Sequence, residues 1–195
     1  VPADYSSLMY PIGMGLVSNS EVVIDNIDLN DSQGDKVIME KLALMGADLN
    51  IDQNKRQLTL RKSALSKGLD IDMSECIDAI SFFAVLGCFI KSGRMRLFNA
   101  GVARTKECDR LSATYKELKK MGANIEEHED SLIIYPSTLQ PASLNSYGDH
   151  RMVLAFSVAA FALNQPSLIQ RASCIEKTYR HFARDMNQLG ANIEV

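Results

Sequence analysis

Met45-Gly46-Ala47-Asp48 recurs as Met121-Gly122-Ala123-Asn124 and again as Leu189-Gly190-Ala191-Asn192, at intervals of roughly 70 residues. A glycine at this point suits a helix that ends in a left-handed residue, because glycine has no Cβ to clash there. Apolar residues stand one and four positions before each glycine, which places them on one face of a helix. The three tetrapeptides therefore predict three amphipathic helices that end alike, and with them a repeated fold.

Each predicted amphipathic helix follows a short strand, and each of these strands follows a strongly apolar helix. The apolar helices are predicted at residues 6–17, 78–90 and 150–163, and the strands at 21–27, 93–99 and 167–172. After the glycine we expect a strand, a polar turn and a second strand, at 47–51 and 57–61 in the first unit and at 123–127 and 131–135 in the second. The third unit stops after its first strand, and further strands are expected at 69–73 and 142–146.

These elements predict an α/β fold of three β-α-β-α-β-β units in one lobe, at about residues 1–65, 66–137 and 138–195. One helix of each unit is apolar all round, which predicts buried, parallel helices, and the other is one-sided, which predicts an outer layer. Repeated units of one handedness aim equivalent helices the same way. We therefore expect the helix N-termini of all three units to gather at one end of the lobe.

Composition excludes several classes of protein. The chain has 195 residues, 46% of them hydrophobic and 23% charged, which is ordinary for a globular protein. A net charge of −3 argues against nucleic-acid and anionic-membrane partners, and no apolar run is long enough to span a bilayer. The four cysteines lack CxxC or metal-ligand spacing, so we expect a reduced, cytoplasmic setting. Val1 is not an initiator Met, which suggests a piece of a longer chain.

Basic residues gather at the predicted helix starts. The run Arg104-Thr105-Lys106-Glu107-Cys108-Asp109-Arg110-Leu111 stands where the second amphipathic helix is expected to begin. His150 and Arg151 open the third apolar helix, and Lys177 opens the third amphipathic helix. Cations are unfavourable at the positive end of a helix dipole unless an anion lies between them. The sequence therefore predicts an anion site where these helix starts meet.

Two carboxylates, Asp78 and Glu107, should lie at the same end. A carboxylate held among cations stays ionised and can act as a base, and a second, less well paired one can deliver a proton. Structural interpretations stay open beside this one. Asp78 and Asp149 could be helix N-caps, and Glu107 could simply neutralise Arg104 or Arg110.

With these residues the chain resembles the enolpyruvyl transferases, and most closely the C-terminal half of the 3-phosphoshikimate 1-carboxyvinyltransferases (EPSP synthases). The resemblance covers essentially the whole chain; it rests on the run 104–111 and on Asp149-His150-Arg151-Met152, with segments 30–35, 77–79 and 176–178 in the expected order. It implies two such lobes with the active site between them. It also implies that the enolpyruvyl group of phosphoenolpyruvate is transferred to the 5-hydroxyl of shikimate 3-phosphate. Phosphate is released, and neither a metal nor an organic cofactor takes part.

The resemblance also implies residue roles. Asp78 would be the base near the 5-hydroxyl, Glu107 would supply the proton to the phosphoenolpyruvate methylene, and Lys106 would contact shikimate 3-phosphate. His150 would line the pocket. The remaining cations would hold phosphoenolpyruvate, since arginine pairs well with carboxylate and phosphate: Arg110, Arg151 and Lys177.

The chain departs from the family in places, and alternatives stay open. Ala3 stands where the family usually has Gly, and Val102 stands where some members carry an Asn that touches shikimate 3-phosphate. The N-terminal lobe is missing, so we expect this chain alone to be inactive or nearly so. One alternative is the UDP-N-acetylglucosamine enolpyruvyl transferase, which shares the fold and the cosubstrate but not normally the pattern of run 104–111. The other is a noncatalytic anion-binding module.

Overall fold

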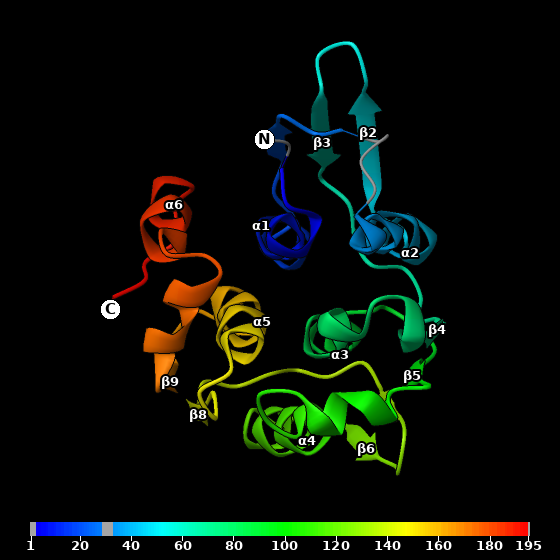
Figure 1. Cartoon of the computed structure of the whole chain (residues 1–195), viewed down its shortest axis with the longest axis vertical. Helices are drawn as coiled ribbons and strands as arrows, with labels where there is room; N and C mark the ends of the chain where they lie inside the picture. The colour runs from blue at the N-terminus through cyan, green and yellow to red at the C-terminus, as the bar shows by residue number, and fades with distance from the viewer. Residues whose placement is uncertain (1–2, 29–32, 195) are drawn as a thin grey trace.

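The computed structural model describes residues 3–28 and 33–194. Three helices pack together at the centre, and Figure 1 looks along them: α1 (Tyr5–Val17), α3 (Ile80–Cys88) and α5 (His150–Phe161). Every residue of α3 is buried, because its sequence offers no polar face. The ring of Phe82 on α3 meets that of Tyr10 on α1 edge to face, with 5.8 Å between ring centroids. The prediction of three buried apolar helices is confirmed.

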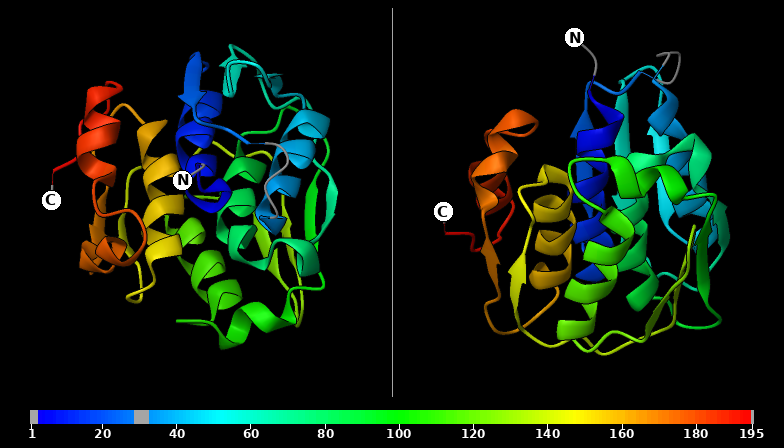
Figure 2. Two further views of the ribbon diagram at one scale, coloured as in Figure 1. Left: turned by 45° about the horizontal axis from the view of Figure 1, so that its top comes forward. Right: turned by 60° about the horizontal axis from the view of Figure 1, so that its bottom comes forward.

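The amphipathic helices lie outside this central group, as Figures 1 and 2 show: α2 (Val37–Met45), α4 (Arg110–Lys120) and α6 (Phe182–Gln188). Each ends close to its predicted glycine. Gly46 caps α2 with a φ of 110°, and Gly122 and Gly190 also have positive φ. A residue with a Cβ would be strained in this conformation, so glycine is the residue that lets these helices end here.

Three small sheets cover the helices on the outside. The first has the order β1 (Val22–Asp25), β3 (Gln57–Arg61) and β2 (Asp48–Asp52), all antiparallel. In the second, β4 (Asp70–Asp72) runs parallel to β5 (Met95–Phe98), followed by β7 (Leu132–Ile134) and β6 (Ile125–Glu127). The third pairs β8 (Ser143–Asn145) with β9 (Leu168–Gln170) in parallel. Each sheet draws its strands from one stretch of the chain, which the proposed division into three units would produce.

One predicted helix start and one predicted strand are wrong. The start expected in run 104–111 is confirmed, although residues 101–105 form the 3-10 helix η4 (Gly101–Thr105) and α4 begins only at Arg110, near the end of that run. In the last unit, 3-10 helix η5 (Ala172–Lys177) precedes α6, so Lys177 ends a short turn and does not open an α-helix. The strand expected after Gly190 does not form. Ile193 instead exchanges two hydrogen bonds with the Asn187 side chain, which folds the chain end back onto α6.

Helix starts from different units meet at one end of the lobe. Arg151, at the start of α5, donates from Nη1 to the Ser6 carbonyl at the start of α1 over 2.8 Å. Arg110, at the start of α4, reaches Asp78 in the 3-10 turn η3 (Ile77–Ala79) that leads into α3. The predicted gathering of helix starts is thereby confirmed for these four helices. Within the described parts of the chain, no helix is both long and apolar enough to cross a membrane.

Candidate active site

Arg110 is the centre of the candidate site. Its side chain is 1% exposed, and its Nε donates to Asp149 Oδ2 at 2.7 Å. Its Nη1 donates to Asp78 Oδ1 at 2.7 Å, and its Nη2 donates to Glu107 Oε2 at 2.8 Å and to Asp149 Oδ1 at 3.3 Å. A buried guanidinium is stable only with such compensation. One side chain therefore joins the starts of α3, α4 and α5.

The aspartates at the helix starts have different roles. Asp149 is fully buried and is the N-cap of α5, where it accepts a hydrogen bond from the Arg151 backbone N–H. Asp109 is the N-cap of α4 and accepts from the Ser112 N–H. The N-cap interpretation is thus confirmed for Asp149, which also binds Arg110. It is wrong for Asp78, since α3 has Ala79 at its cap position with no side-chain hydrogen bond.

Asp78 is surrounded by cations. Its Oδ1 lies 3.3 Å from Lys106 Nζ as well as against Arg110, and its Oδ2 lies 3.8 Å from Arg151 Nη2. Burial alone would raise the pKa of this carboxyl. The hydrogen bond from Arg110 and the charges of Arg110, Arg151 and Lys106 outweigh burial, so the pKa of Asp78 is lowered. Asp78 is therefore ionised at neutral pH.

Glu107 and His150 form the more open side of the site. The Glu107 side chain is 40% exposed, and its Oε1 lies 3.8 Å from His150 Nδ1. Burial and the charge of Arg151 lower the pKa of His150, so its imidazole is neutral at pH 7. Its Nδ1 is buried and has no hydrogen-bond partner among the described residues. The neutral imidazole of His150 thus lies beside Glu107, a carboxylate that solvent can reach.

Arg151 is held at the end of its side chain but not along it. Nη1 donates to the Ser6 carbonyl, whereas Nε is buried without a hydrogen-bond partner in the parts of the chain that the structure describes. The Tyr10 hydroxyl is likewise buried without a hydrogen-bond partner among the described residues. Burial raises the pKa of Tyr10 to about 12 despite the nearby charge of Arg151. Neither Ser6 nor Tyr10 was predicted as a site residue. Both stand within the apolar pattern of α1, which gives no signal of this contact.

Arg104 leaves the predicted site. It donates from Nε to the Glu129 carbonyl, and its Nη1 pairs with Asp109 and Glu127 at 2.9 and 2.8 Å. These contacts tie η4 to the turn between β6 and β7. The sequence predicted that the cations of run 104–111 await an external anion. The protein's own carboxylates pair with both arginines. Arg104 is thereby drawn out of the site, whereas anion binding by Arg110 stays a prediction that requires one of its carboxylates to be displaced.

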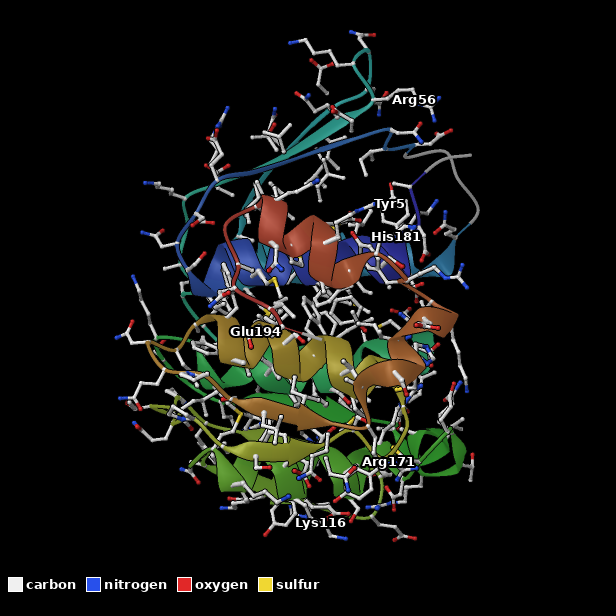
Figure 3. All side chains as sticks on the ribbon, turned by 90° about the vertical axis from the view of Figure 1, so that its left-hand side faces the viewer. Tyr5, Arg56, Lys116, Arg171, His181 and Glu194 are labelled. Carbon is white, nitrogen blue, oxygen red and sulfur yellow. The ribbon has the colours of Figure 1, made fainter. Side chains whose placement is uncertain are left out.

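Lys177 is not brought into the cluster. It is exposed at the end of η5, which packs beside α5 (Figure 3). No ion pair or hydrogen bond of its side chain to another described residue is found. Residues 29–32, which include part of the segment 30–35 used for the resemblance, lie outside the described residues. Within the described ranges, no group of three or more His, Cys, Asp and Glu side chains is arranged to hold a metal ion.

This arrangement combines anion binding with proton transfer. Lys106 and Arg151 stand beside an ionised Asp78, and Glu107 stands where water or a ligand can reach it. Cations near the reacting groups can hold a phosphate or carboxylate, and the two carboxyl groups differ in environment, as an acid and a base must.

Comparison with known proteins identifies the family. The family model for EPSP synthase (3-phosphoshikimate 1-carboxyvinyltransferase) matches residues 1–186. The chain is 41% identical over 196 residues to the 3-phosphoshikimate 1-carboxyvinyltransferase of Methanocaldococcus jannaschii, covering 100% of this chain and 45% of that protein. The corresponding protein of Ruminiclostridium cellulolyticum is 37% identical, over 100% of this chain and 45% of its own length.

A solved structure agrees in fold. The EPSP synthase of Acinetobacter baumannii superposes with a TM-score of 0.84 at 22% sequence identity, covering all of this chain and 47% of that one. The chain therefore spans about half the length of the relatives it matches, and its fold corresponds to one lobe of such a protein. Because the family model matches nearly the whole sequence, this chain belongs to the EPSP synthase (3-phosphoshikimate 1-carboxyvinyltransferase) family.

Proposed function

We propose that this chain is one lobe of an enzyme that transfers the enolpyruvyl group of phosphoenolpyruvate to the 5-hydroxyl of shikimate 3-phosphate and releases phosphate. One observation carries the proposal: Arg110 holds two candidate catalytic carboxylates, Asp78 and Glu107, beside the cations Lys106 and Arg151. The family match supports shikimate 3-phosphate over UDP-N-acetylglucosamine as the proposed acceptor. The proposed reaction uses neither a metal nor an organic cofactor.

In the proposed reaction Asp78 takes the proton of the 5-hydroxyl. The oxygen of this hydroxyl attacks C2 of phosphoenolpyruvate at the same time. Glu107 gives a proton to the methylene carbon, so a tetrahedral intermediate forms. The resulting methyl group then returns a proton to Glu107 while the bond from C2 to the phosphate oxygen breaks, which restores the double bond. The phosphate leaves with the proton that Asp78 had taken, so both carboxyl groups regain their starting state. Lys106 would contact shikimate 3-phosphate, and His150 would line the pocket.

Phosphoenolpyruvate would be held by Arg110, Arg151 and Lys177. Because Arg110 already binds three carboxylates, an incoming anion has to replace one of them. Asp149 is fully buried, whereas Glu107 is 40% and Asp78 is 34% exposed. Asp78 is also paired with Lys106 and Arg151, so Glu107 is the partner that is most easily displaced. We infer that phosphoenolpyruvate frees Glu107 from Arg110 and thereby makes it available for proton transfer.

The same anion would change the basicity of Asp78. The pKa of this carboxyl is lowered by the cations around it, which makes it a weak base in the unliganded site. A bound dianion offsets those charges, and nearby negative charge disfavours an ionised carboxylate. The pKa of Asp78 should therefore rise when phosphoenolpyruvate binds, which makes the carboxylate a better general base.

A second lobe completes the proposed site. The relatives are about twice as long as this chain, and their additional half would face the helix starts. We propose that this chain alone binds phosphoenolpyruvate weakly and does not turn it over. We also propose that it works in the cytoplasm, where its four free cysteines would stay reduced.

Phosphate release by the two-lobed protein tests the proposal. We expect release with phosphoenolpyruvate and shikimate 3-phosphate, and none with UDP-N-acetylglucosamine. Asp78→Asn and Glu107→Gln should each lower kcat by about 10²- to 10⁴-fold, the range for a lost general acid or base. Asp70→Asn is the matched control, because Asp70 is also paired with an arginine but lies at the surface. Undiminished release by the Asp78→Asn/Glu107→Gln double variant would refute the assignment and favour a noncatalytic anion-binding module.

A further inference from the structure

Glu117 is a buried carboxylate that the proposed chemistry does not use. It lies on α4 seven residues after Arg110, close to two turns or roughly 10 Å along the axis, so both face the same side. Its side chain is fully buried. Oε1 accepts from the Tyr147 hydroxyl at 2.8 Å, and Oε2 accepts from the Asn145 N–H at 2.9 Å and from Lys120 Nζ at 2.6 Å.

Side chains of α4 therefore form hydrogen bonds with both ends of one segment, residues 145–149. Glu117 holds the beginning of the segment through Asn145 and Tyr147, and Arg110 holds its end through Asp149. This segment connects β8 to α5. It ends on the N-cap that starts the helix carrying His150 and Arg151, so its position sets theirs.

The segment has an unusual backbone. Tyr147 has a φ of 56° and Gly148 a φ of 76°, so two consecutive residues are left-handed. That conformation is unfavourable for a residue with a side chain. Local bonds support it: the Tyr147 N–H donates to Asn145 Oδ1, and the Gly148 N–H donates to Ser146 Oγ. Strained backbone persists where its surroundings over-determine it, and such strain gathers at functional sites.

We propose that Glu117 is a positioning residue for the site: through Tyr147 and Asn145 it fixes the segment 145–149, and thereby the place of Asp149, which orients Arg110. The inference rests on the proposed function for its catalytic consequence. A merely structural carboxylate at this depth is hard to explain, because apolar side chains of similar size are often neutral or stabilising in such places. Among the described residues, the side chain of Glu117 accepts hydrogen bonds only from this segment and from Lys120 on the same helix.

Kinetics of the two-lobed protein provide the first test. Tyr147→Phe removes a single hydrogen bond, the one to Glu117. The matched control is Tyr115→Phe: Tyr115 lies on α4, as Glu117 does, and its hydroxyl has no hydrogen bond to a described residue. Hydrogen bonds to charged groups are stronger than those between neutral groups, and a tenfold change in binding corresponds to roughly 1.4 kcal/mol. We expect Tyr147→Phe to raise the KM for phosphoenolpyruvate about tenfold and to lower kcat less than about threefold. Tyr115→Phe should change neither.

A graded pair of substitutions extends this test. Glu117→Gln keeps one acceptor oxygen, whereas Glu117→Leu removes both at similar volume. Glu117→Leu should therefore raise the KM more than Glu117→Gln does, with each variant assayed well below its own Tm. Equal KM values for wild type and both variants, with only a lower Tm, would show a structural role and overturn the proposal.

A spectroscopic signature separates this inference from the proposed function. The Nε proton of Arg110, held by Asp149 at 2.7 Å, should exchange slowly with solvent in NMR spectra of this chain. Tyr147→Phe should speed that exchange and shift the signal, and Tyr115→Phe should not. An unchanged Arg110 signal overturns positioning by Glu117 whatever the kinetics show. Absence of phosphate release by the wild-type two-lobed protein overturns the proposed function, and the Arg110 signal then still decides the positioning.

Discussion

Arg110 donates from Nε to Asp149 Oδ2 across 2.7 Å, with 1% and 0% of the two side chains exposed. The pair Arg94–Asp70 is almost as short, at 2.8 Å, yet its side chains are 42% and 50% exposed. Water screens the second pair and can replace either partner, whereas the buried first pair is not screened and water cannot replace a lost partner. The same chemistry at the same distance should therefore have very different consequences for stability.

Removing the arginine from each pair measures this difference. Arg110→Met leaves Asp149 buried without its main partner, and we expect the free energy of unfolding to fall by about 3–5 kcal/mol. Arg94→Met should lower it by less than about 1 kcal/mol. Urea denaturation of both variants provides the comparison. Losses of equal size would contradict the burial that separates the two pairs.

The lowered pKa of Asp78 predicts how stability depends on pH. Its folded pKa lies below the unfolded value of about 3.9, so ionised Asp78 stabilises the fold above that value. The contribution is lost as the pH falls through the folded pKa. Between about pH 5 and pH 2, the wild type should therefore lose stability more steeply than Asp78→Asn does. The free energy of unfolding of both proteins is measured by urea denaturation at each pH. Parallel curves for wild type and Asp78→Asn would contradict the lowered pKa of Asp78.

The elements predicted correctly are those whose signals are local. The three glycines and the apolar helices follow from the spacing of neighbouring residues, so the central helices and Gly46, Gly122 and Gly190 could be predicted. The exact first residue of α4 could not be predicted, because Arg104 donates hydrogen bonds to Glu127 and to the Glu129 carbonyl, more than twenty residues away. Tertiary contacts decided that boundary.

The candidate site was predictable in its members but not in its pairing. Charge at helix starts indicated Asp78, Arg110 and Arg151, yet nothing local shows that Arg110 would bind Asp149, 39 residues later. The position of Glu117 in the helical pattern could have predicted its burial, although it was not among the predicted site residues. It lies between the buried residues Thr114 and Leu118 on the inner face of α4, where an unpaired carboxylate is unfavourable.

Cys108 should be unreactive although it lies within the candidate site. Its thiol donates to Asp149 Oδ2 at 3.6 Å, and burial together with the charge of Asp149 raises the pKa of Cys108 to about 12. Only the thiolate reacts with iodoacetamide, so alkylation at pH 8 should be about a thousandfold slower than for an ordinary thiol of pKa near 8.5. Mass spectrometry of the Cys108 peptide, native against urea-unfolded, measures the ratio. Equal rates would contradict the raised pKa.

Gly13 lies where α1 packs tightly against α3 and α5. A Cβ at this position of α1 would lie 2.5 Å from Phe82 Cε2 on α3 and 3.2 Å from Val158 Cγ1 on α5. Phe82 cannot easily move aside, because its ring is packed against Tyr10 and Phe83. Alanine gains about 1 kcal/mol in helix propensity, but overpacking a core costs about 1–3 kcal/mol.

Gly13→Ala should therefore lower the free energy of unfolding by up to about 2 kcal/mol in urea denaturation. Gly101→Ala is the control, since the nearest atom to its added Cβ is Asp130 Cβ at 3.9 Å, and it should change stability by less than about 0.5 kcal/mol. Phe82→Leu removes the obstructing ring edge. In that background, Gly13→Ala should lose its penalty, because sites in contact are not additive. A penalty of the same size in both backgrounds would show that the clash with Phe82 is not its cause.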